Sequence, residues 1–373
     1  ADGENIAVRR LRIRAAGFRG HLGPEEAERR QKDNLAFARD GVDTVGLAGR
    51  NLVVEDCDLY GSGRSLFLLR PRATRIVGNL FQNGRQGWYS ISGADGVVFA
   101  NNKVVGADLE STGGGINTLF AGVAMSTNVL VRNNRFETLF GWDGEALTTD
   151  GPGGFYYGPV EADVGDVLRL RGTPTNRPDY QDWRGAGVFV MSGRGRGEWA
   201  RVVSRQGDRV RLDRRLQVSP DPNDMISIVP FQGRHLSIDN SFVDAAIAVQ
   251  VFGTGIENVI AGNQSERTRG ILVKALVYQH VQPTWYNQVL GNDIVSPSFE
   301  GNASIGIWAN TNGQFSGAMN VMTIVRGNRL HGNASVELRG QPPHGNLVMD
   351  PLVEHNEIRD AWRGIYVTNG VAG

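Results

Sequence analysis

The sequence has a single cysteine, Cys57, and therefore excludes an intramolecular disulfide and any metal site built from several cysteines. No stretch approaches the ~18 consecutive apolar residues of a membrane-spanning helix. The first residues, ADGENIAVRR, include neither the basic region nor the apolar core of a signal peptide. Cysteine usage leaves the cellular compartment open.

The chain also lacks an excess of either charge, because 39 Lys and Arg residues balance 39 Asp and Glu residues. Without a net charge there is no long-range attraction to nucleic acid or to an anionic membrane, so we expect neither as a partner. The six histidines are scattered without metal-ligand spacing, and no HExxH, GxSxG, phosphate-binding loop or GxGxxG motif occurs. We therefore expect no metal and no cofactor.

What the sequence has in abundance is turn residues between short β-branched runs. Fifty glycines and 14 prolines punctuate the chain, and almost no apolar stripe of period 3.6 persists. This pattern predicts an all-β protein.

One short motif recurs along the chain: an aliphatic residue, two or three residues often ending in Asn, one variable residue and an apolar one. Examples are FANNKV, VRNNRF and VRGNRL. The equivalent position is held by Cys57, Asn79, Asn102, Asn134, Asn240, Asn263, Asn292, Asn328 and Asn356. Most neighbours in this series are 22 to 36 residues apart, which suits one coil of a solenoid with loops of variable length.

A second strand lies between these motifs, of the form Gly-apolar-x-apolar, as in AIAVQV, GILVK, IGIWA and GIYVT. Asn tolerates the left-handed backbone region that a sharp corner between strands requires. Its amide can also hydrogen-bond to the same residue one coil away. We therefore expect the Asn residues to occupy the corners and to form a ladder.

This Asn-rich coil pattern resembles the right-handed parallel β-helix of the pectate-lyase-like superfamily, over about residues 5–158 and 233–373. The resemblance implies the fold, a carbohydrate-active protein and a place outside the cytoplasm, either extracellular or periplasmic. It does not specify an activity.

One spacing between equivalent Asn residues is much longer than the others, since Asn134 and Asn240 are 106 residues apart. Residues 159–232 alternate differently, in VLRLR, VFVM, WARVV, VRLD and MISIV, which predicts a small antiparallel β-module. The stretch resembles modules inside some β-helix glycan-processing and phage-tail proteins. We expect N-terminal coils in residues 1–158, the inserted module in 159–232 and C-terminal coils in 233–373.

Both ends of the chain fall inside the repeat, near the strand AVRRLRI and directly after GIYVTN. Solenoids need caps that cover their open edges. We expect a further chain segment or a partner to cap them.

The densest cluster of reactive and ring-bearing residues lies at 140–158, directly before the insertion. Aromatic rings can stack on sugar faces, and carboxylates can catalyse glycoside chemistry. The predicted substrate-stacking residues are Trp142, Phe155, Tyr156 and Tyr157, and the predicted catalytic carboxylates are Glu145, Asp150 and Asp143. The alternative is structural: Asp143 and Asp150 can belong to turns, and Glu145 can pair with an arginine.

The stereochemical outcome stays open. Asp143 and Glu145 on one strand would lie ~6.5 to 7 Å apart at Cα, whereas a partner on the next coil would be only ~4.8 Å away. The first separation suits an inverting reaction and the second a retaining one. Asp244 is the nearest acidic residue by repeat alignment. Trp88 and Trp285 are further candidates to line the groove, although each could equally cover the solenoid surface.

Three functions follow from these residues. The first is a glycoside hydrolase acting on a poly- or oligosaccharide by carboxylate catalysis. The second is a polysaccharide lyase that cleaves a uronate polymer by β-elimination, for which no constellation of acid and base is evident. The third is a noncatalytic glycan-binding or tail-fibre-like structural protein. We favour the hydrolase because acidic residues dominate the cluster.

Overall fold

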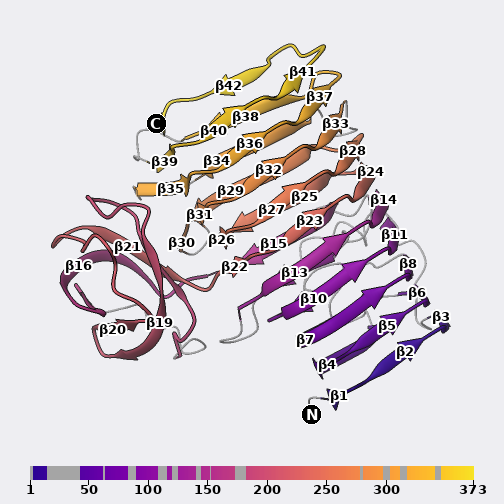
Figure 1. Ribbon diagram of the computed structural model, residues 1–373, viewed down its shortest axis with the longest axis horizontal. Coiled ribbons are helices and arrows are strands. Elements are labelled where there is room, and N and C mark those ends of the chain that lie inside the picture. Colours follow the sequence, from indigo (N-terminus) through magenta and orange to yellow (C-terminus); the bar gives the residue numbers. More distant parts are fainter. Residues whose placement is uncertain are drawn as a thin grey trace, which may run out of the picture.

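The computed structural model describes residues 3–14, 43–61, 64–82, 90–107, 116–119, 125–139, 144–151, 153–172, 182–277, 280–296, 303–310, 317–340 and 346–373. These residues form strands and turns without any helix, and none of them makes a segment suited to cross a membrane as a helix. Figure 1 shows the strands stacked coil upon coil, with a small barrel at one side. The predicted all-β parallel β-helix with an inserted antiparallel β-module is confirmed.

Each coil contributes one strand to each of three faces, which we name after the strands of one coil. The β13 face consists of β2 (Ala7–Arg9), β5 (Val53–Glu55), β7 (Phe67–Val77), β10 (Asp95–Ala100), β13 (Thr127–Arg132), β23 (Leu236–Ile238), β27 (Val259–Ala261), β32 (Gln288–Leu290), β36 (Ile324–Arg326) and β40 (Leu352–Glu354).

The β14 face is a separate ten-stranded sheet. It consists of β3 (Arg12–Arg14), β6 (Asp58–Tyr60), β8 (Leu80–Gln82), β11 (Lys103–Ala107), β14 (Arg135–Leu139), β24 (Ser241–Ala245), β28 (Gln264–Glu266), β33 (Asp293–Val295), β37 (Arg329–His331) and β41 (Glu357–Ile358).

The β15 face carries the candidate site. It consists of β4 (Gly46–Arg50), β9 (Ile91–Ser92), β12 (Ile116–Leu119), β15 (Glu145–Gly151), β25 (Ile247–Gly253), β29 (Gly270–Val277), β34 (Ser304–Asn310), β38 (Ser335–Arg339) and β42 (Ile365–Val367). Strand β7 also pairs with β4 and β9. Short strands complete the large sheet: β1 (Gly3–Glu4), β22 (Gln232–Gly233), β26 (Gly255–Ile256), β30 (Val281–Gln282), β31 (Thr284–Trp285), β35 (Gly317–Val321), β39 (Asn346–Met349) and β43 (Val371–Ala372).

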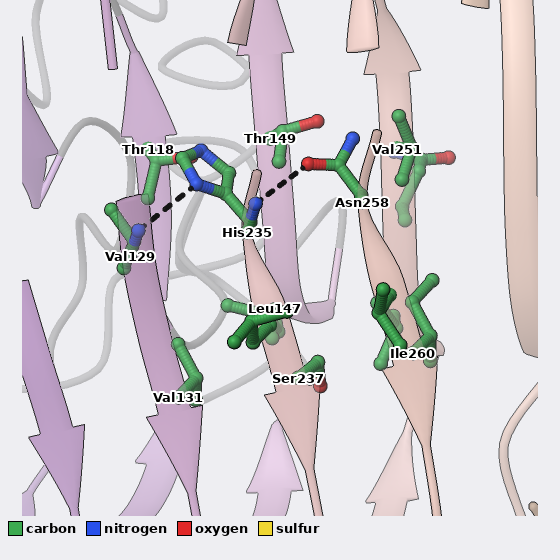
Figure 2. Close-up of a pocket in the computed structure, with 14 residues that line it drawn as sticks. Thr118, Val129, Val131, Leu147, Thr149, His235, Ser237, Val251, Asn258 and Ile260 are labelled. Carbon is green, nitrogen blue, oxygen red and sulfur yellow. Dashed lines mark hydrogen bonds between the residues drawn. The ribbon is translucent and has the colours of Figure 1, made fainter. Parts of the chain in front are cut away.

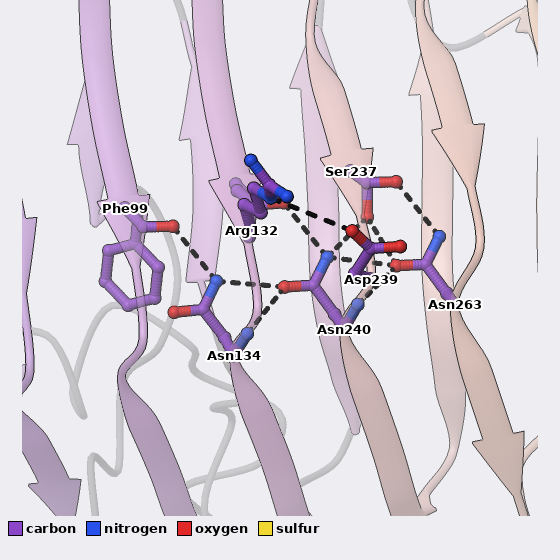
Figure 3. Close-up of polar contacts among 8 residues, drawn as sticks. Phe99, Arg132, Asn134, Ser237, Asp239, Asn240 and Asn263 are labelled. Atoms are coloured by element: carbon purple, nitrogen blue, oxygen red, sulfur yellow. Dashed lines mark hydrogen bonds and ion pairs between the residues drawn. The ribbon is translucent and has the colours of Figure 1, made fainter.

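The predicted Asn ladder runs through the solenoid at the corner between the β13 and β14 faces. Each amide oxygen accepts hydrogen bonds from the backbone N–H and the side-chain NH₂ of the preceding Asn, as Asn263 does from Asn240 at 3.0 Å each (Figure 3). The NH₂ group also donates to a carbonyl of the preceding coil, as Asn134 does to Phe99 at 2.9 Å. Since buried polar groups are stable only when hydrogen-bonded, the ladder fixes the stacking of the coils.

The corner differs from the prediction in one respect. The left-handed residue is not the ladder Asn but the residue before it: Asn101, Asn133 and Asp239 have φ values of 55°, 54° and 56°. In other coils a glycine holds this position, for example Gly78 with φ of 72°. The two positions have different roles. The left-handed residue turns the chain at the surface, and the side chain of the next residue points into the interior.

Rings stack along the interior beside the ladder. The centroids of Phe136 and Phe242 are 5.0 Å apart, and those of Phe99 and Phe81 are 5.6 Å apart. These residues are at most 3% exposed. Phe81, Phe136 and Phe242 hold one register position of the β14 face, with Val104 between the first two, and Phe99 of β10 packs against Phe81 and Phe136.

The insertion is a closed six-stranded barrel made of β16 (Tyr156–Val164), β17 (Val167–Leu170), β18 (Gly187–Val190), β19 (Trp199–Gln206), β20 (Arg209–Leu212) and β21 (Met225–Val229). Its interior is a core of its own, in which the rings of Phe155 and Trp183 stack at 5.3 Å. The first barrel strand begins at Tyr156, shortly before the predicted module boundary at 159. The division into three parts stays a prediction.

The barrel packs against the solenoid through side chains on its outer surface. Phe189 meets Trp285 edge to face at 5.0 Å, and Phe231 meets Trp199 at 5.6 Å. The hydroxyl of Ser227 donates to the carbonyl of Val281 at 2.6 Å. Figure 1 shows the barrel beside β22, β26, β31 and β35. Because these rings belong to the same buried cluster as the solenoid core, the barrel is an integral part of the molecule.

Candidate functional site on the β15 face

Glu145, the first predicted carboxylate, opens β15 directly after Gly144, whose φ is 55°. The side chain of Gln250 in the neighbouring strand β25 donates to Glu145 Oε1 at 2.6 Å. Gln250 is 2% exposed, so its amide is held in one orientation. A carboxylate oriented by a buried amide is a positioned acid-base or hydrogen-bonding group.

Lys274 lies in β29, two strands from β15, and is in register with Phe252 and Asp150. Burial lowers the pKa of Lys274, the negative charge of Glu145 raises it, and the positive charge of Arg269 lowers it further. Burial is the largest cause, so the pKa lies below its ordinary value. A buried lysine with a lowered pKa is a common device for proton transfer.

Two rings flank this ammonium group. Phe252 is in register with Lys274, and Lys274 is in register with Trp308. Lys274 Nζ lies 5.2 Å from the centroid of the Phe252 ring and 5.5 Å from that of the Trp308 ring. Both distances lie in the range of cation–π attraction.

The Trp308 ring covers Gly306, because a Cβ at that glycine would stand 2.7 Å from Trp308 Nε1. That Nε1 is buried and finds no hydrogen-bond partner within the part of the chain described. Buried indole N–H groups usually have an acceptor. This N–H edge of the ring therefore lies over Gly306 and not at the outer surface of the site.

The alternation of cations and rings continues towards β42. Arg339 lies over Trp308 at 4.9 Å and near Tyr366 at 5.8 Å. Arg363 lies over Tyr366 at 4.6 Å and over Trp362 at 4.9 Å. We call this series the cation–aromatic strip; its members are Phe252, Lys274, Trp308, Arg339, Tyr366, Arg363 and Trp362.

Two of the predicted carboxylates lie on strand β15. Glu145 and Asp150 are five residues apart, hence about 16 Å apart at Cα from a rise of ~3.3 Å per residue, and the Glu145 carboxylate is held by Gln250, the register partner of Thr148. Their role as a catalytic pair stays a prediction. Asp143 lies outside the described residues, as do Trp142 and Trp88.

Asp244 lies on the surface of the solenoid at the end of β24, where Arg267 binds it with both guanidinium arms at 2.6 and 2.9 Å. This hydrogen-bonded ion pair lowers the pKa of Asp244. The residue has a structural partner, which corrects the expectation that it faces the substrate.

The rings predicted to stack on sugar are also corrected. Trp285 is fully buried and donates its indole N–H to the carbonyl of Ala318 at 2.8 Å. Phe155 and Tyr156 belong to the barrel core, where the Tyr156 hydroxyl donates to Pro159 O at 2.7 Å and lies 2.9 Å from Arg171 O. Tyr157 is half-buried and packs against the solenoid core. The buried rings of Trp285, Phe155 and Tyr156 are therefore not stacking platforms, and the role of Tyr157 stays a prediction.

A small cavity lies inside the solenoid at the level of β15, lined by aliphatic side chains and by His235 (Figure 2). Nδ1 of His235 accepts a hydrogen bond from the backbone N–H of Val129 at 3.4 Å, and the backbone N–H of His235 donates to Asn258 Oδ1 at 3.0 Å. Burial lowers the pKa of His235 to about 3. The cavity of about 30 Å³ has room for little more than a water molecule, so it is not a substrate site.

Within the described residues, no three His, Cys, Asp or Glu side chains come together to hold a metal ion.

The residues that the sequence-based prediction missed are Gln250, Lys274 and Trp308. A signal for two of them was present, because alignment of GILVK (270–274) with SIGIW (304–308) places Lys274 and Trp308 at one position.

No protein-family model matches this chain, and no curated protein matches it by sequence. Among solved structures, the surface protein and adhesin PfbA of Streptococcus pneumoniae has 12% identity and a TM-score of 0.43, with 86% of this chain and 77% of that chain covered. A hyperthermoactive exopolygalacturonase from Thermotoga maritima has 11% identity and a TM-score of 0.42, covering 100% and 70%.

The tailspike of Acinetobacter baumannii bacteriophage AP22, solved with a capsular saccharide, has 6% identity and a TM-score of 0.21, covering 80% and 68%. At such identities and scores these likenesses do not identify a function. The assignment of this chain as a parallel β-helix rests on its own strand pairings and its Asn ladder.

Proposed function

We propose that this chain is a carbohydrate-active protein that binds a glycan on the outer side of the β15 face, over Glu145, Lys274 and Trp308. One observation carries the proposal: Lys274 Nζ lies between two rings, and the charge of a carboxylate that a buried amide orients raises its pKa against the effect of burial. Rings offer flat apolar surfaces to the C–H faces of a sugar. The carboxylate, the amide and the ammonium group offer hydrogen bonds to its hydroxyls.

Hydrolysis of a glycosidic bond is the first candidate reaction, with Glu145 as one of two carboxylates. Two residues are the proposed partners: Asp150, which is in register with Phe252 and Lys274, and Asp143, two residues before Glu145 in the sequence.

β-Elimination from a uronate is the second candidate reaction, and the lowered pKa of Lys274 favours it. A lyase needs a base for the C5 proton and a cation that neutralises the uronate carboxylate. Lys274 in its neutral form would accept the proton, while Arg339, on the other side of Trp308, would bind the carboxylate. The proton would pass from C5 to Nζ, a double bond between C4 and C5 would form as the bond from C4 to the leaving oxygen breaks, and the leaving oxygen would take a proton from water.

The test is a panel of neutral and acidic polysaccharides, with binding and products analysed for the wild type and for Glu145→Gln, Lys274→Met and Trp308→Ala. Hydrolysis yields new reducing ends without unsaturation, and we then expect Glu145→Gln to abolish turnover. Elimination yields an unsaturated product that absorbs ultraviolet light, and we then expect Lys274→Met to abolish it. Binding without turnover identifies a noncatalytic glycan-binding protein.

Glu137→Gln is the matched control for the carboxylate, since it changes an acid on the β14 face that already pairs with Lys103 and Arg135. We expect this variant to keep at least half of the wild-type turnover. The proposal fails if no glycan in the panel binds, or if Trp308→Ala binds every glycan as the wild type does.

A further inference from the structure

We propose that the outer side of the β13 face is the interface of a two-fold symmetric dimer. A second copy of this chain packs against the same face of the first, and the two solenoids run in opposite directions. This surface takes no part in the proposed function, which uses the β15 face. The pattern of outward side chains on the strands of the β13 face carries the inference.

The outward side chains of the β13 face are mostly apolar. One residue of each strand points into the core, as Val131 of β13 does, so the residues before and after it point outward. Because the strands pair in register, the outward residues form two columns along the solenoid. The first column is Ala7, Val53, Arg75, Val98, Leu130, Leu236, Val259, Gln288, Ile324 and Leu352. The second column is Arg9, Glu55, Val77, Ala100, Arg132, Ile238, Ala261, Leu290, Arg326 and Glu354.

The β14 face shows the contrast. One of the ten residues in the first column of the β13 face is charged, whereas seven of ten are charged in the column that begins the strands of the β14 face. That column is Arg12, Asp58, Leu80, Lys103, Arg135, Ser241, Gln264, Asp293, Arg329 and Glu357. Leu236 and Leu352 of the apolar column are 37% and 40% exposed. A long apolar stripe beside a charged face marks an interaction surface.

The first column reads nearly the same in both directions from its midpoint between Leu130 and Leu236. A two-fold axis that lies in the interface at this midpoint, parallel to the strands, would place each residue against its counterpart in the partner. A symmetric dimer needs a surface that is complementary to itself in this way. The facing pairs are Leu130 with Leu236, Val98 with Val259, Arg75 with Gln288, Val53 with Ile324 and Ala7 with Leu352.

The second column is complementary in charge about the same midpoint. Arg9 and Glu55 at one end correspond to Glu354 and Arg326 at the other. In the dimer Arg9 would lie against the partner's Glu354, and Glu55 against the partner's Arg326. Within one copy Arg9 pairs with Glu55 at 3.1 Å, and Arg326 pairs with Glu354. The two ion pairs would thus join into one network of alternating charges, which fixes the orientation of the copies.

A second copy that ran in the same direction would fit poorly. A two-fold axis along the solenoid would place the first column of one copy over the second column of the other. Val53 would then cover the partner's Glu55, and Leu130 the partner's Arg132. Charges buried against apolar side chains are costly, so the pattern favours opposite directions.

The stripe has the size of a specific interface. Two outward residues on each of ten strands give twenty residues per copy, and specific interfaces use ~20 to 30 residues on each side. Nine spacings of ~4.8 Å give a length of about 43 Å. The barrel packs beside β22, β26, β31 and β35, at the start of these strands, and therefore borders the stripe (Figure 1).

The first experiment measures the mass of the whole chain in solution by sedimentation velocity at micromolar concentrations. We expect a dimer for the wild type. Leu236→Arg places a charge against the partner's Leu130 and close to the partner's Arg132, so the dissociation constant should rise at least about tenfold. Val295→Arg is the matched control, because Val295 is a 40% exposed aliphatic residue on the β14 face. Circular dichroism checks that both variants fold.

The second experiment tests the direction of the copies with a short cross-linker that joins two thiols. Val98 and Val259 lie three strand spacings apart in one copy, about 14 Å, but face each other between copies in the proposed dimer. We therefore expect Val98→Cys/Val259→Cys to give covalent dimers on a denaturing gel. Val98→Cys/Ala100→Cys is the control, since these two positions would meet only if the copies ran in the same direction.

The inference is overturned if the wild type is a monomer or a trimer, or if Leu236→Arg associates as tightly as Val295→Arg. Covalent dimers from the Val98→Cys/Ala100→Cys pair alone would also overturn it, because they show copies that run in the same direction. Glycan binding is not a readout of either experiment, so these outcomes leave the proposed function as it stands.

Discussion

Asn134 and Asn240 are direct neighbours in the ladder although 106 residues separate them in the sequence. The backbone N–H and the side-chain NH₂ of Asn134 donate to Asn240 Oδ1 at 3.0 and 2.9 Å (Figure 3). Asn240 and Asn263, only 23 residues apart, make the same two bonds at 3.0 Å each. The barrel is therefore inserted between two coils without disturbing their stacking.

Asn240→Ala should destabilise the protein by about 3 kcal/mol. The replacement leaves the N–H of Asn134 and the carbonyl of Val131 buried without a partner, and each such group costs ~1 to 3 kcal/mol. The free energy of unfolding in urea measures the effect. Asn356→Ala is the control at the half-buried end of the ladder, and its loss should be smaller. Equal losses would contradict a cooperative ladder.

Cys57→Asn should extend the ladder by one coil and stabilise the protein by about 1 kcal/mol. The thiol already stands where an amide would donate, 3.6 Å from the carbonyl of Val8, and the backbone N–H of Cys57 already donates to Asn79 at 2.9 Å. Chemical denaturation of Cys57→Asn and Cys57→Ala measures the difference. An Asn variant less stable than the Ala variant would show that the first coil cannot accommodate the amide.

Stability should fall as the pH is lowered from about 6.5 towards 4. Burial lowers the pKa of His235 to about 3 and that of His280 to about 4 in the folded protein, whereas an unfolded histidine has a pKa of ~6.5. In this window the unfolded chain binds more protons than the folded one, so protonation favours unfolding. The stability is fully present above pH 6.5 and lost as the pH falls through the folded pKa values.

Each histidine should contribute a slope of up to ~1.4 kcal/mol per pH unit in that window. A second, shorter ladder runs from Asn258 to Asn287, where the Asn258 side chain donates to Asn287 at 2.9 Å. The backbone N–H of His235 already donates to Asn258, so His235→Asn should extend this ladder and reduce the slope. Thermal unfolding at several pH values checks this. A slope that persists unchanged in both His235→Asn and His280→Gln would assign the acid sensitivity to other groups.

Lys274→Met should stabilise the fold by about 1 kcal/mol while it weakens glycan binding, since functional sites often keep groups that cost stability. The methionine fills the space of the lysine stem between the rings of Phe252 and Trp308 but brings no charge to bury. Lys103→Met is the control; it removes an ion pair with Glu137 and should cost no more than ~1 kcal/mol. A Lys274→Met variant less stable than the wild type would contradict a cost of burying this amine.

The solenoid could be predicted because the Asn residues of its ladder recur in a short sequence motif. An Asn at one position of FANNKV, VRNNRF and VRGNRL implies the same corner in each coil, and the hydrogen bonds follow from stacking. The closure of the inserted module into a barrel could not be predicted, because closure depends on pairings such as Tyr156 with Ile228 between residues far apart in the sequence.

The candidate site was harder to predict, since burial is a property of the tertiary structure. Trp285 lies in a stretch that reads as a loop, QHVQPTWYN, yet it occupies the core beneath Phe189. Density of aromatic residues in the sequence therefore indicated the barrel core rather than a sugar platform. Lys274 and Trp308 become neighbours only when the second strands are placed in register.

The cross-strand pairing of Tyr156 with Ile228 brings the entry and the exit of the barrel to one point. A module whose two ends adjoin behaves as a cassette: its length and sequence can be exchanged while the coils before and after it keep their alignment. Any replacement module must cover the Trp285 ring and exclude water from it, as Phe189 does in this protein.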